Sequence, residues 1–285
     1  MSIADPNQPQ PDLADLLRFY ADAGVDEALF DEPVDRFEES ATTRQPAVQK
    51  GEPPKLREPA APSPQPRPAP AMTVPDEAQA TRARELARQA QSLEELSAIV
   101  AAFDGCNLKF TAKQTVFSAG NPQADLMLVG EAPGRDEDIE GLPFVGRSGR
   151  LLDRMLAAIG VDRTTAYIAN VIPWRPPGNR TPTPLETEIC RPFIERQIEL
   201  VAPKVLVTLG GPSAKVLLHA TEGVLRLRGN WKTHVTASGA EIAAMPTLHP
   251  AYLLRNPAHK KLAWRDLLEV RAKLEALRGE SSGPS

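Results

Sequence analysis

The sequence predicts an α/β fold, a three-layer α/β/α sandwich around a central, mostly parallel four-stranded sheet. Four short apolar runs, typical of buried strands, recur between residues 124 and 249. Longer stretches with apolar residues at helical spacing separate these runs. Short buried strands that alternate with helices are typical of a parallel sheet covered by helices on both faces.

Each of these elements has its own signal in the sequence. The expected strands are residues 124–130, 166–172, 204–210 and 241–249, and the expected helices between them are 149–160, 184–201 and Ser213–Ala220. Residues 77–102 read as helix before the first strand, with Ser92 and Glu95 forming a capping box that begins a second segment. In such sheets ligands bind beyond the carboxyl ends of the strands. We therefore expect the functional residues at the carboxyl ends of these strands.

The chain divides into segments of different composition. We expect an acidic leader at 1–40 with a short amphipathic helix at 12–23, a Pro-rich disordered linker at 41–76, a globular domain at 77–278, and a disordered tail at 279–285. Ten prolines lie between residues 41 and 76, which favours an extended linker over a packed structure. The helix of the leader either docks on a partner or on the main domain, or it frays.

Charge and composition set limits on the class of protein. The net charge of −4 divides into −7 for residues 1–85 and +3 for 86–285, so the larger part permits nucleic acid as a partner without arguing for it. The sequence has no run of eighteen apolar residues, and its first residues lack the pattern of a secretory signal. Two cysteines fit a reducing compartment. We therefore expect a cytoplasmic monomer that does not contact membranes.

The first expected strand ends in Gly130-Glu131-Ala132-Pro133-Gly134. This is neither a dinucleotide fingerprint nor a phosphate loop, and the glycines alone indicate no more than a tight turn. Phe144 follows on the same polar loop. An apolar ring at a ligand-binding edge suggests a stacking surface for a planar group.

Two further polar residues follow strands. Asn170 lies near the end of the second strand, where its amide offers a donor and an acceptor to the edge of a base, although an Asn there is more often a turn former. His249 stands at the end of the last strand, where it is either packed or functional. These residues taken singly leave both alternatives open.

Five segments together resemble the uracil-DNA glycosylase superfamily, in particular its bacterial thermostable type, family 4. They are GEAPGRDEDIEGLPFVGRSGRLLDRML, YIANVIPWRPPGNRTPTPLE, VLVTLGGPSA, LRG (227–229) and LHPAYLLRNP. The resemblance runs from about residue 95 to 275. It implies an enzyme that flips uracil out of single- and double-stranded DNA and hydrolyses the N-glycosidic bond.

The resemblance also implies roles in binding the base. Phe144 would stack on the uracil ring, and Asn170 would read its polar edge. His249 would hydrogen-bond uracil O2 and stabilise the charge that grows on the leaving base. The backbone from Gly130 to Ala132 would add donors.

Three further residues are implied in catalysis. Glu137 resembles an acid that pairs with Asn179 and so holds the first motif in shape. Glu131 stands next to the position where other branches of the superfamily place a water-activating carboxylate. Its role is either direct or structural.

The segment after His249 is expected to be a loop that enters the minor groove of the DNA. Leu253 or Leu254 would be the apolar wedge that fills the gap left by the flipped base. Arg255, Arg147 and Arg175 are candidate phosphate contacts, each with an ordinary solvated surface as the alternative.

The sequence departs from family 4 at the four cysteines that hold an iron–sulfur cluster in that family. Phe103 and Trp174 stand at two of the four positions, and only Cys106 and Cys190 remain. Two thiolates cannot build a four-thiolate cluster. We expect no cofactor, an apolar plug in the place of the cluster, and two reduced thiols beside it.

Two other functions stay open at this point. One is a glycosylase of the same superfamily with broader or shifted base specificity, such as hypoxanthine or xanthine. The other is a DNA damage-binding protein with low turnover. Residues 1–40 are in addition a candidate segment for recruiting a repair or replication protein.

Overall fold

The computed structural model describes residues 77–281, with side chains described for 77–278. The expected leader, its helix and the Pro-rich linker lie outside the described residues. The sheet has six strands in the order β1-β3-β2-β4-β6-β5. Their bounds are β1 Ser118–Gly120, β2 Leu126–Gly130, β3 Ala166–Asn170, β4 Val205–Leu209, β5 Lys232–Val235 and β6 Glu241–Thr247.

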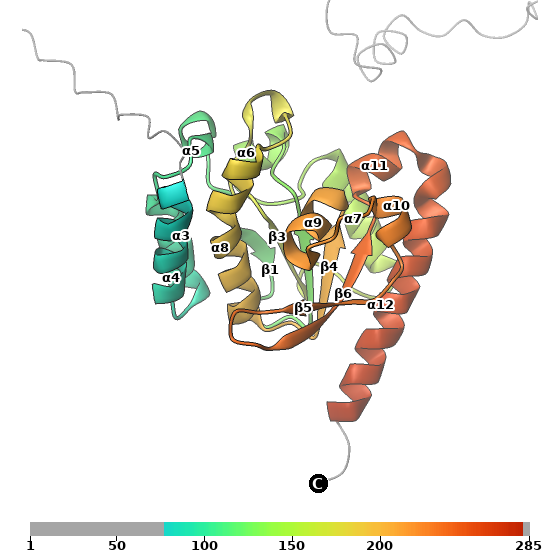
Figure 1. Cartoon of the computed structure of the whole chain (residues 1–285). Coiled ribbons are helices and arrows are strands. Elements are labelled where there is room, and N and C mark those ends of the chain that lie inside the picture. The colour runs from blue at the N-terminus through green and yellow to red at the C-terminus, as the bar shows by residue number, and fades with distance from the viewer. Residues whose placement is uncertain (1–76, 282–285) are drawn as a thin grey trace, which may run out of the picture. The chain divides into compact units, whose positions relative to one another are not determined.

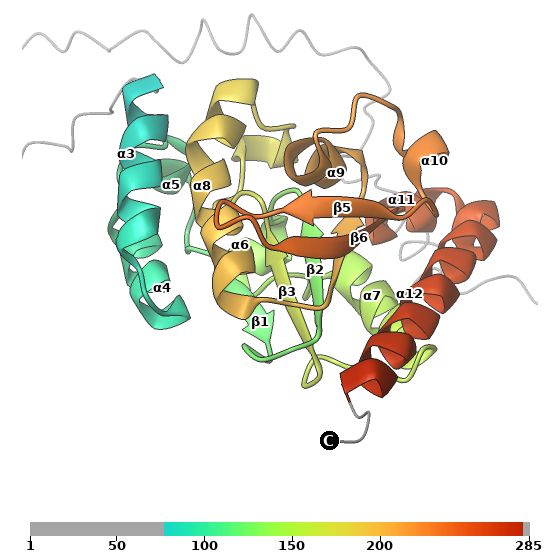
Figure 2. The ribbon, with the colours of Figure 1, turned by 60° about the horizontal axis from the view of Figure 1, so that its bottom comes forward.

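The four expected strands are the central four, and they are parallel to one another. The α/β fold class is thus confirmed, while the sheet is larger than the four strands expected. β1 pairs antiparallel with β3, and β5 pairs antiparallel with β6. The sequence did not reveal these edge strands because β1 has three residues and β5 is mostly exposed, so neither has an apolar run. Figure 2 shows β5 beside β6 at the edge of the sheet, next to α9.

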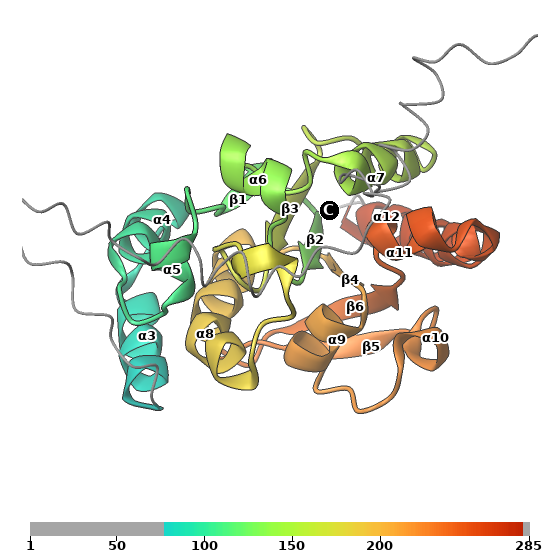
Figure 3. The same ribbon diagram turned by 90° about the horizontal axis from the view of Figure 1, so that it is seen from above.

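Helices cover both faces of the sheet. On one face lie α8 Pro184–Val201 and α9 Gly211–Leu218, with α3 Glu77–Gln89 and α4 Leu93–Ala102 packed against α8, and on the other face lie α7 Arg147–Ala157 and α12 Lys260–Ser281. Figures 1 and 3 show the sheet between these layers. Alternate residues of β2 point to opposite layers: Met127 and Val129 pack in the α8 layer, and Leu126 and Leu128 pack in the α7 layer.

Capping residues explain where two of the helices begin. Ser92 accepts a hydrogen bond from the Glu95 N–H at the start of α4, as the sequence predicts. Thr183 and Glu186 form a capping box that begins α8, and Pro184 occupies the first position of that helix. The box fixes the point at which the Pro-rich segment after β3 turns into α8.

Shorter helices complete the chain: α5 Leu108–Thr111, α6 Arg135–Glu140, η1 Pro177–Asn179, α10 Val224–Leu227, α11 Pro250–Arg255 and η2 Pro257–His259. The segment after His249, expected to be a loop, is therefore mostly the helix α11. α12 runs to Ser281, so the first residues of the expected tail belong to a helix. Among the described residues, no helix combines the length and the apolar character needed to span a membrane.

Candidate active site

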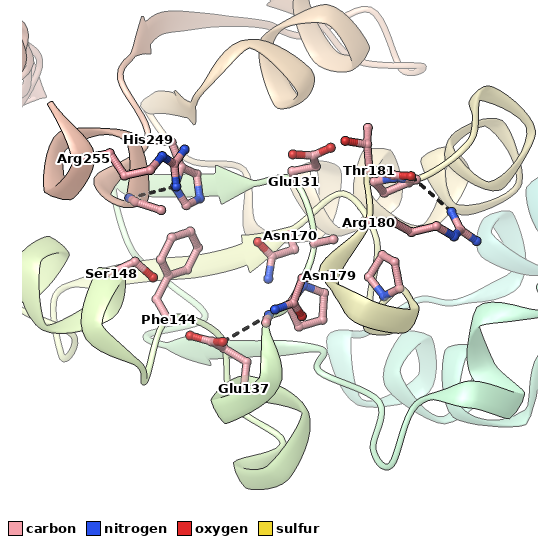
Figure 4. A pocket seen from close by; sticks show the side chains of 16 residues that line it. Glu131, Glu137, Phe144, Ser148, Asn170, Asn179, Arg180, Thr181, His249 and Arg255 are labelled. Atoms are coloured by element: carbon pink, nitrogen blue, oxygen red, sulfur yellow. Dashed lines mark hydrogen bonds between the residues drawn. The ribbon is translucent and has the colours of Figure 1, made fainter. Parts of the chain in front are cut away.

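A cavity of about 310 Å³ opens at the carboxyl ends of β2 and β3. Glu131 and Asn170 reach it from these strands, Phe144 from the loop before α7, and His249 from the end of β6. Figure 4 shows these side chains turned toward one another. The cavity lies where a parallel sheet is expected to bind its ligand.

Phe144 is held rigidly at the cavity wall. Its backbone is left-handed (φ 55°), which is unusual for an aromatic residue. Arg163 donates hydrogen bonds to the carbonyl oxygens of Pro143 and Phe144. A Cβ on Gly149 would lie 1.7 Å from the Phe144 carbonyl oxygen, so only glycine permits this approach of α7. The ring is therefore presented in one orientation.

Glu137 organises the loop that carries Phe144. Its carboxylate accepts hydrogen bonds from the backbone N–H of Gly134 at 3.0 Å and from Val145 and Gly146, both at 3.1 Å. The side chain is buried, and these three bonds tie the start of α6 to the start of α7.

Asn179 does not form the expected hydrogen bond with Glu137. Asn179 Oδ1 instead accepts a hydrogen bond from Arg175 Nε at 2.7 Å. Asn179 nevertheless lines the cavity, and its backbone is left-handed (φ 54°). The sequence could not distinguish these partners because the turn at η1 decides which way the amide points.

Asn170 is buried to 6% exposure. Within the described residues, its Oδ1 atom has no hydrogen-bond partner. A buried polar atom without a partner costs about 1–3 kcal/mol. A Cβ on Gly130 would lie 2.4 Å from this oxygen and 2.6 Å from the Phe144 ring, so the glycine makes room for both groups. The amide is placed to receive a ligand.

His249 caps the N-terminus of α11. Its Nδ1 accepts a hydrogen bond from the Ala251 N–H at 3.1 Å, so in the neutral ring the proton is on Nε2. Burial, with a smaller effect of the Arg255 charge, lowers the pKa of His249 to about 4. The imidazole is therefore a neutral donor at pH 7. Its ring centre lies 5.5 Å from that of Phe144.

Glu131 lies on the opposite side of the cavity from Phe144 (Figure 4). Burial raises the pKa of this carboxyl group above its usual value. A perturbed carboxyl group in a cavity is a candidate for a direct role in catalysis. The peptide that follows it also belongs to the cavity, because Ala132 is part of the lining.

Comparison with known proteins agrees with this arrangement. The sequence profile of the Uracil DNA glycosylase superfamily matches residues 117–268. The chain belongs to the uracil-DNA glycosylase superfamily. Three similar proteins named Type-4 uracil-DNA glycosylase come from Sulfurisphaera tokodaii (38% identical, covering 63% of this chain and 84% of that protein), Archaeoglobus fulgidus (39%, 59% and 85%) and Thermotoga maritima (39%, 54% and 79%).

The residues expected to touch DNA separate into two groups in this superfamily member. Leu254 is half-buried and lines a shallow cavity beside the active site together with the exposed Arg147 and Arg255. Leu253 is 1% exposed and packs in a cluster with Leu151. Leu253 is therefore a core residue, and of the two leucines only Leu254 has a side chain that is partly exposed.

The guanidinium of Arg175, another candidate phosphate contact, is already engaged within the protein. It donates to Asn179, and its guanidinium lies 3.9 Å from the buried carboxylate of Asp138. Asp138 in turn accepts a hydrogen bond from the Lys113 N–H at 2.7 Å. Arg175 therefore joins η1 to α6, which is a structural task.

Several lining residues were missed by sequence reasoning: Ser148, Arg180, Thr181, Pro182 and Ala251. Ser148 lies in the segment GEAPGRDEDIEGLPFVGRSGRLLDRML, and Arg180 to Pro182 lie in the segment YIANVIPWRPPGNRTPTPLE. The signal was thus present. Their types carry no chemistry that singles them out, so only the cavity shows their place.

The four residues at the positions where the resemblance to family 4 expects cluster ligands, Phe103, Cys106, Trp174 and Cys190, lie in one buried cluster. Phe103 and Trp174 are each 1% exposed, and their rings stack with centres 6.5 Å apart. The Cys106 and Cys190 Sγ atoms lie 3.9 Å apart, and burial raises the pKa of the Cys190 thiol. Among residues 77–278, no group of three or more His, Cys, Asp or Glu side chains could hold a metal ion. These residues do not fit a four-thiolate cluster.

Proposed function

We propose that this protein is a uracil-DNA glycosylase that flips uracil out of DNA and hydrolyses its N-glycosidic bond. The observation that carries the proposal is the buried, unpartnered Oδ1 of Asn170, in a cavity that also presents the neutral His249. Uracil supplies N3–H as donor and O4 as acceptor, which match the amide of Asn170. Cytosine presents the opposite pattern at these two positions, so the amide supports discrimination between the bases.

The chemistry follows from the neutral histidine. As the bond between C1′ and N1 breaks, its electron pair leaves with the base, and negative charge grows on uracil O2. The Nε2–H of His249 donates a hydrogen bond to that oxygen. Removal of one such donor typically lowers kcat about 10²–10³-fold. Phe144 stacks on the ring and keeps the base in the plane that this bond requires.

Water completes the reaction on the sugar. Its oxygen bonds to C1′, and its proton passes to Glu131 when that carboxyl group is ionised, or otherwise to solvent. Because burial raises the pKa of Glu131, its carboxylate is a better proton acceptor than that of an ordinary glutamate. Because the sugar develops positive charge, an ionised Glu131 also stabilises it electrostatically.

Binding to DNA uses the surface around α11. Leu254 enters the gap left by the flipped base, and Arg147 and Arg255 contact phosphates. The protein acts on single- and double-stranded DNA as a cytoplasmic monomer that starts base excision repair. Residues 1–40 are a candidate segment for recruiting a repair or replication protein.

We further propose that the enzyme works without an iron–sulfur cluster. Phe103 and Trp174 supply the packing that the cluster supplies in family 4, and Cys106 and Cys190 remain as reduced thiols. All the groups assigned to the reaction lie outside this region, at the carboxyl end of the sheet. No step of the reaction is assigned to the thiols.

The test is a panel of oligonucleotides that each carry one uracil, hypoxanthine, xanthine or mismatched thymine, in single- and double-stranded form. Uracil should be released fastest from both forms. The His249→Ala variant should still unfold cooperatively, at a lower temperature because the cap of α11 is lost, and should lose about 10²–10³-fold in turnover. Intact uracil oligonucleotides, under conditions where a control glycosylase cuts them, would refute the proposed function. Faster release of another base would mean that the protein is a glycosylase of the same superfamily with a different base specificity.

A further inference from the structure

A second cavity, of about 480 Å³, adjoins the active site. The two cavities share Glu131, Thr181 and Pro182 in their linings, so a single wall separates them. Figure 4 shows Glu131 and Thr181 beside each other at the end of the active-site cavity away from Phe144 and Ser148. None of the roles proposed above uses this second cavity.

The walls of the second cavity are largely apolar. Val171 and Ile172 directly follow β3, and Val216 projects from α9. Pro184 and Pro212, which begin α8 and α9, contribute rigid rings to the same lining. Flat apolar surfaces of this kind accept the face of a planar ring.

The rim of the cavity carries charge. Lys215 and His219 are exposed and reach it from α9. Arg191 reaches it from α8, where its guanidinium is in ion pairs with Glu188 at 3.3 Å and Glu195 at 3.1 Å. The Lys215 ammonium is the group best placed to meet a phosphate, because Arg191 is already engaged.

We propose that the second cavity holds the nucleobase next to the uracil on the same DNA strand, with Lys215 near its phosphate. The inference rests on the proposed function, because the occupant is the strand that also carries the flipped uracil. The two cavities adjoin at Glu131, Thr181 and Pro182, so a strand with uracil in the first cavity brings its neighbouring nucleotide close to the second. The second cavity is larger than the one assigned to uracil, so a nucleobase fits.

The subsite serves single-stranded DNA. In a duplex, the neighbouring base stays stacked and paired, and taking it out costs a few kcal/mol. In a single strand that cost is smaller, and stacking of a base on protein contributes about 1–3 kcal/mol. The subsite should therefore raise kcat/KM for a single-stranded substrate and leave kcat/KM for a duplex unchanged.

The experiment compares single-stranded uracil oligonucleotides that lack one neighbouring base. A tetrahydrofuran residue replaces the nucleotide either on the 5′ or on the 3′ side of uracil, which keeps the phosphate and removes the base. The wild-type protein should lose roughly tenfold in kcat/KM at one of the two sides. The same replacement in a duplex should leave kcat/KM within about twofold of the unmodified duplex.

Thr187→Phe tests whether the effect arises in this cavity. Thr187 lines the cavity, and its hydroxyl donates to the carbonyl oxygen of Thr183, four residues earlier. Phe at this position fills the cavity, so the loss on base removal should disappear. Thr81→Phe is the matched control, because Thr81 makes the same bond to Glu77 on α3 and lines neither cavity. It should retain the tenfold loss.

A charge change tests the rim. Lys215→Glu should raise KM for single-stranded DNA by several-fold at low salt, and the difference should shrink as salt is added. Lys273→Glu makes the same change on an exposed part of α12 that lines neither cavity, and it should have little effect.

The outcomes separate this inference from the proposed function. The subsite is refuted, while uracil excision stands, if neither the 5′ nor the 3′ replacement lowers kcat/KM. It is also refuted if the loss persists in Thr187→Phe. If the protein does not cut uracil at all, the proposed function fails. The subsite is then decided by fluorescence anisotropy with the same strands carrying an uncleavable 2′-fluoro-deoxyuridine: a base-dependent affinity that Thr187→Phe abolishes supports it, and its absence refutes it.

Discussion

The imidazole of His249 accepts a hydrogen bond at Nδ1 from the backbone N–H of Ala251, at 3.1 Å. Because Ala251 lies in the first turn of α11, this N–H belongs to the helix terminus that His249 caps. One bond therefore satisfies the helix and fixes the tautomer of the ring. It leaves Nε2–H as the donor at the cavity.

The first prediction concerns the pH dependence of turnover. The pKa of His249 is lowered to about 4, so the ring stays neutral through the usual His titration range. Protonation below that pH would turn Nδ1 into a donor facing the Ala251 N–H and would disrupt the cap. Turnover should thus be free of a His titration near pH 6.5. A profile of kcat/KM between pH 4 and 8 checks this, and a limb near 6.5 would contradict it.

The Glu131 carboxyl group also titrates, with a pKa that burial raises above its usual value, so the profile of Glu131→Gln is needed to assign a limb to His249. The limb that remains in this variant is assigned to His249 and should lie near pH 4. Nitrogen NMR of the ring should report the Nε2–H tautomer at pH 7.

The second prediction concerns the stability of Glu131→Gln. Burial raises the folded-state pKa of Glu131, so the stability present below the unfolded pKa is lost as pH rises through the folded pKa. Gln does not ionise and does not suffer this loss. The variant should therefore melt at a higher temperature than wild type at pH 7, with the gap closing near pH 4, and its turnover should fall.

Thermal unfolding at the two pH values measures this effect. Glu241→Gln, at an exposed position in β6, is the control and should show no such gap. A Glu131→Gln variant that melts lower at pH 7 would mean that the carboxylate is stabilised by the fold, contrary to its burial.

The third prediction separates two adjacent leucines. Leu254→Ala should leave the fold intact and raise KM for duplex DNA about tenfold, because the gap beside the flipped base is no longer filled. Its activity on single-stranded DNA should change less than twofold, since a single strand has no such gap. Leu253→Ala should lower the free energy of unfolding by about 2–5 kcal/mol, because the side chain is in the core. Equal effects of the two variants on duplex cleavage would refute the assignment.

The fourth prediction concerns the aromatic residues in the place of the cluster. Trp174→Ala should lower the free energy of unfolding by about 3–5 kcal/mol, because it empties a buried site. Trp264→Ala should cost much less, since Trp264 is 42% exposed. Denaturant unfolding gives both values. Protein purified without oxygen should be colourless, and iron bound in stoichiometric amount would contradict the replacement of the cluster by packing.

The agreement between sequence and structure is strongest where local pattern and packing act together. The four central strands are largely apolar because both faces of the sheet are covered there, so their sequences show them clearly. The edge strands β1 and β5 are held by pairing with β3 and β6 rather than by their own composition. α11 was missed for a related reason: it has only six residues, beginning with Pro250 after the capping His249, and α7 supplies its packing.

The sequence by itself determined the fold class, the central strands and the order of the motifs, because these depend on apolar periodicity and on residue types at strand ends. Tertiary structure alone decided what each side chain faces. It directed Glu137 to three backbone N–H groups, turned Asn179 toward Arg175, and placed Leu253 in the core while leaving Leu254 at the surface. These outcomes depend on contacts between residues far apart in the chain, which no local pattern encodes.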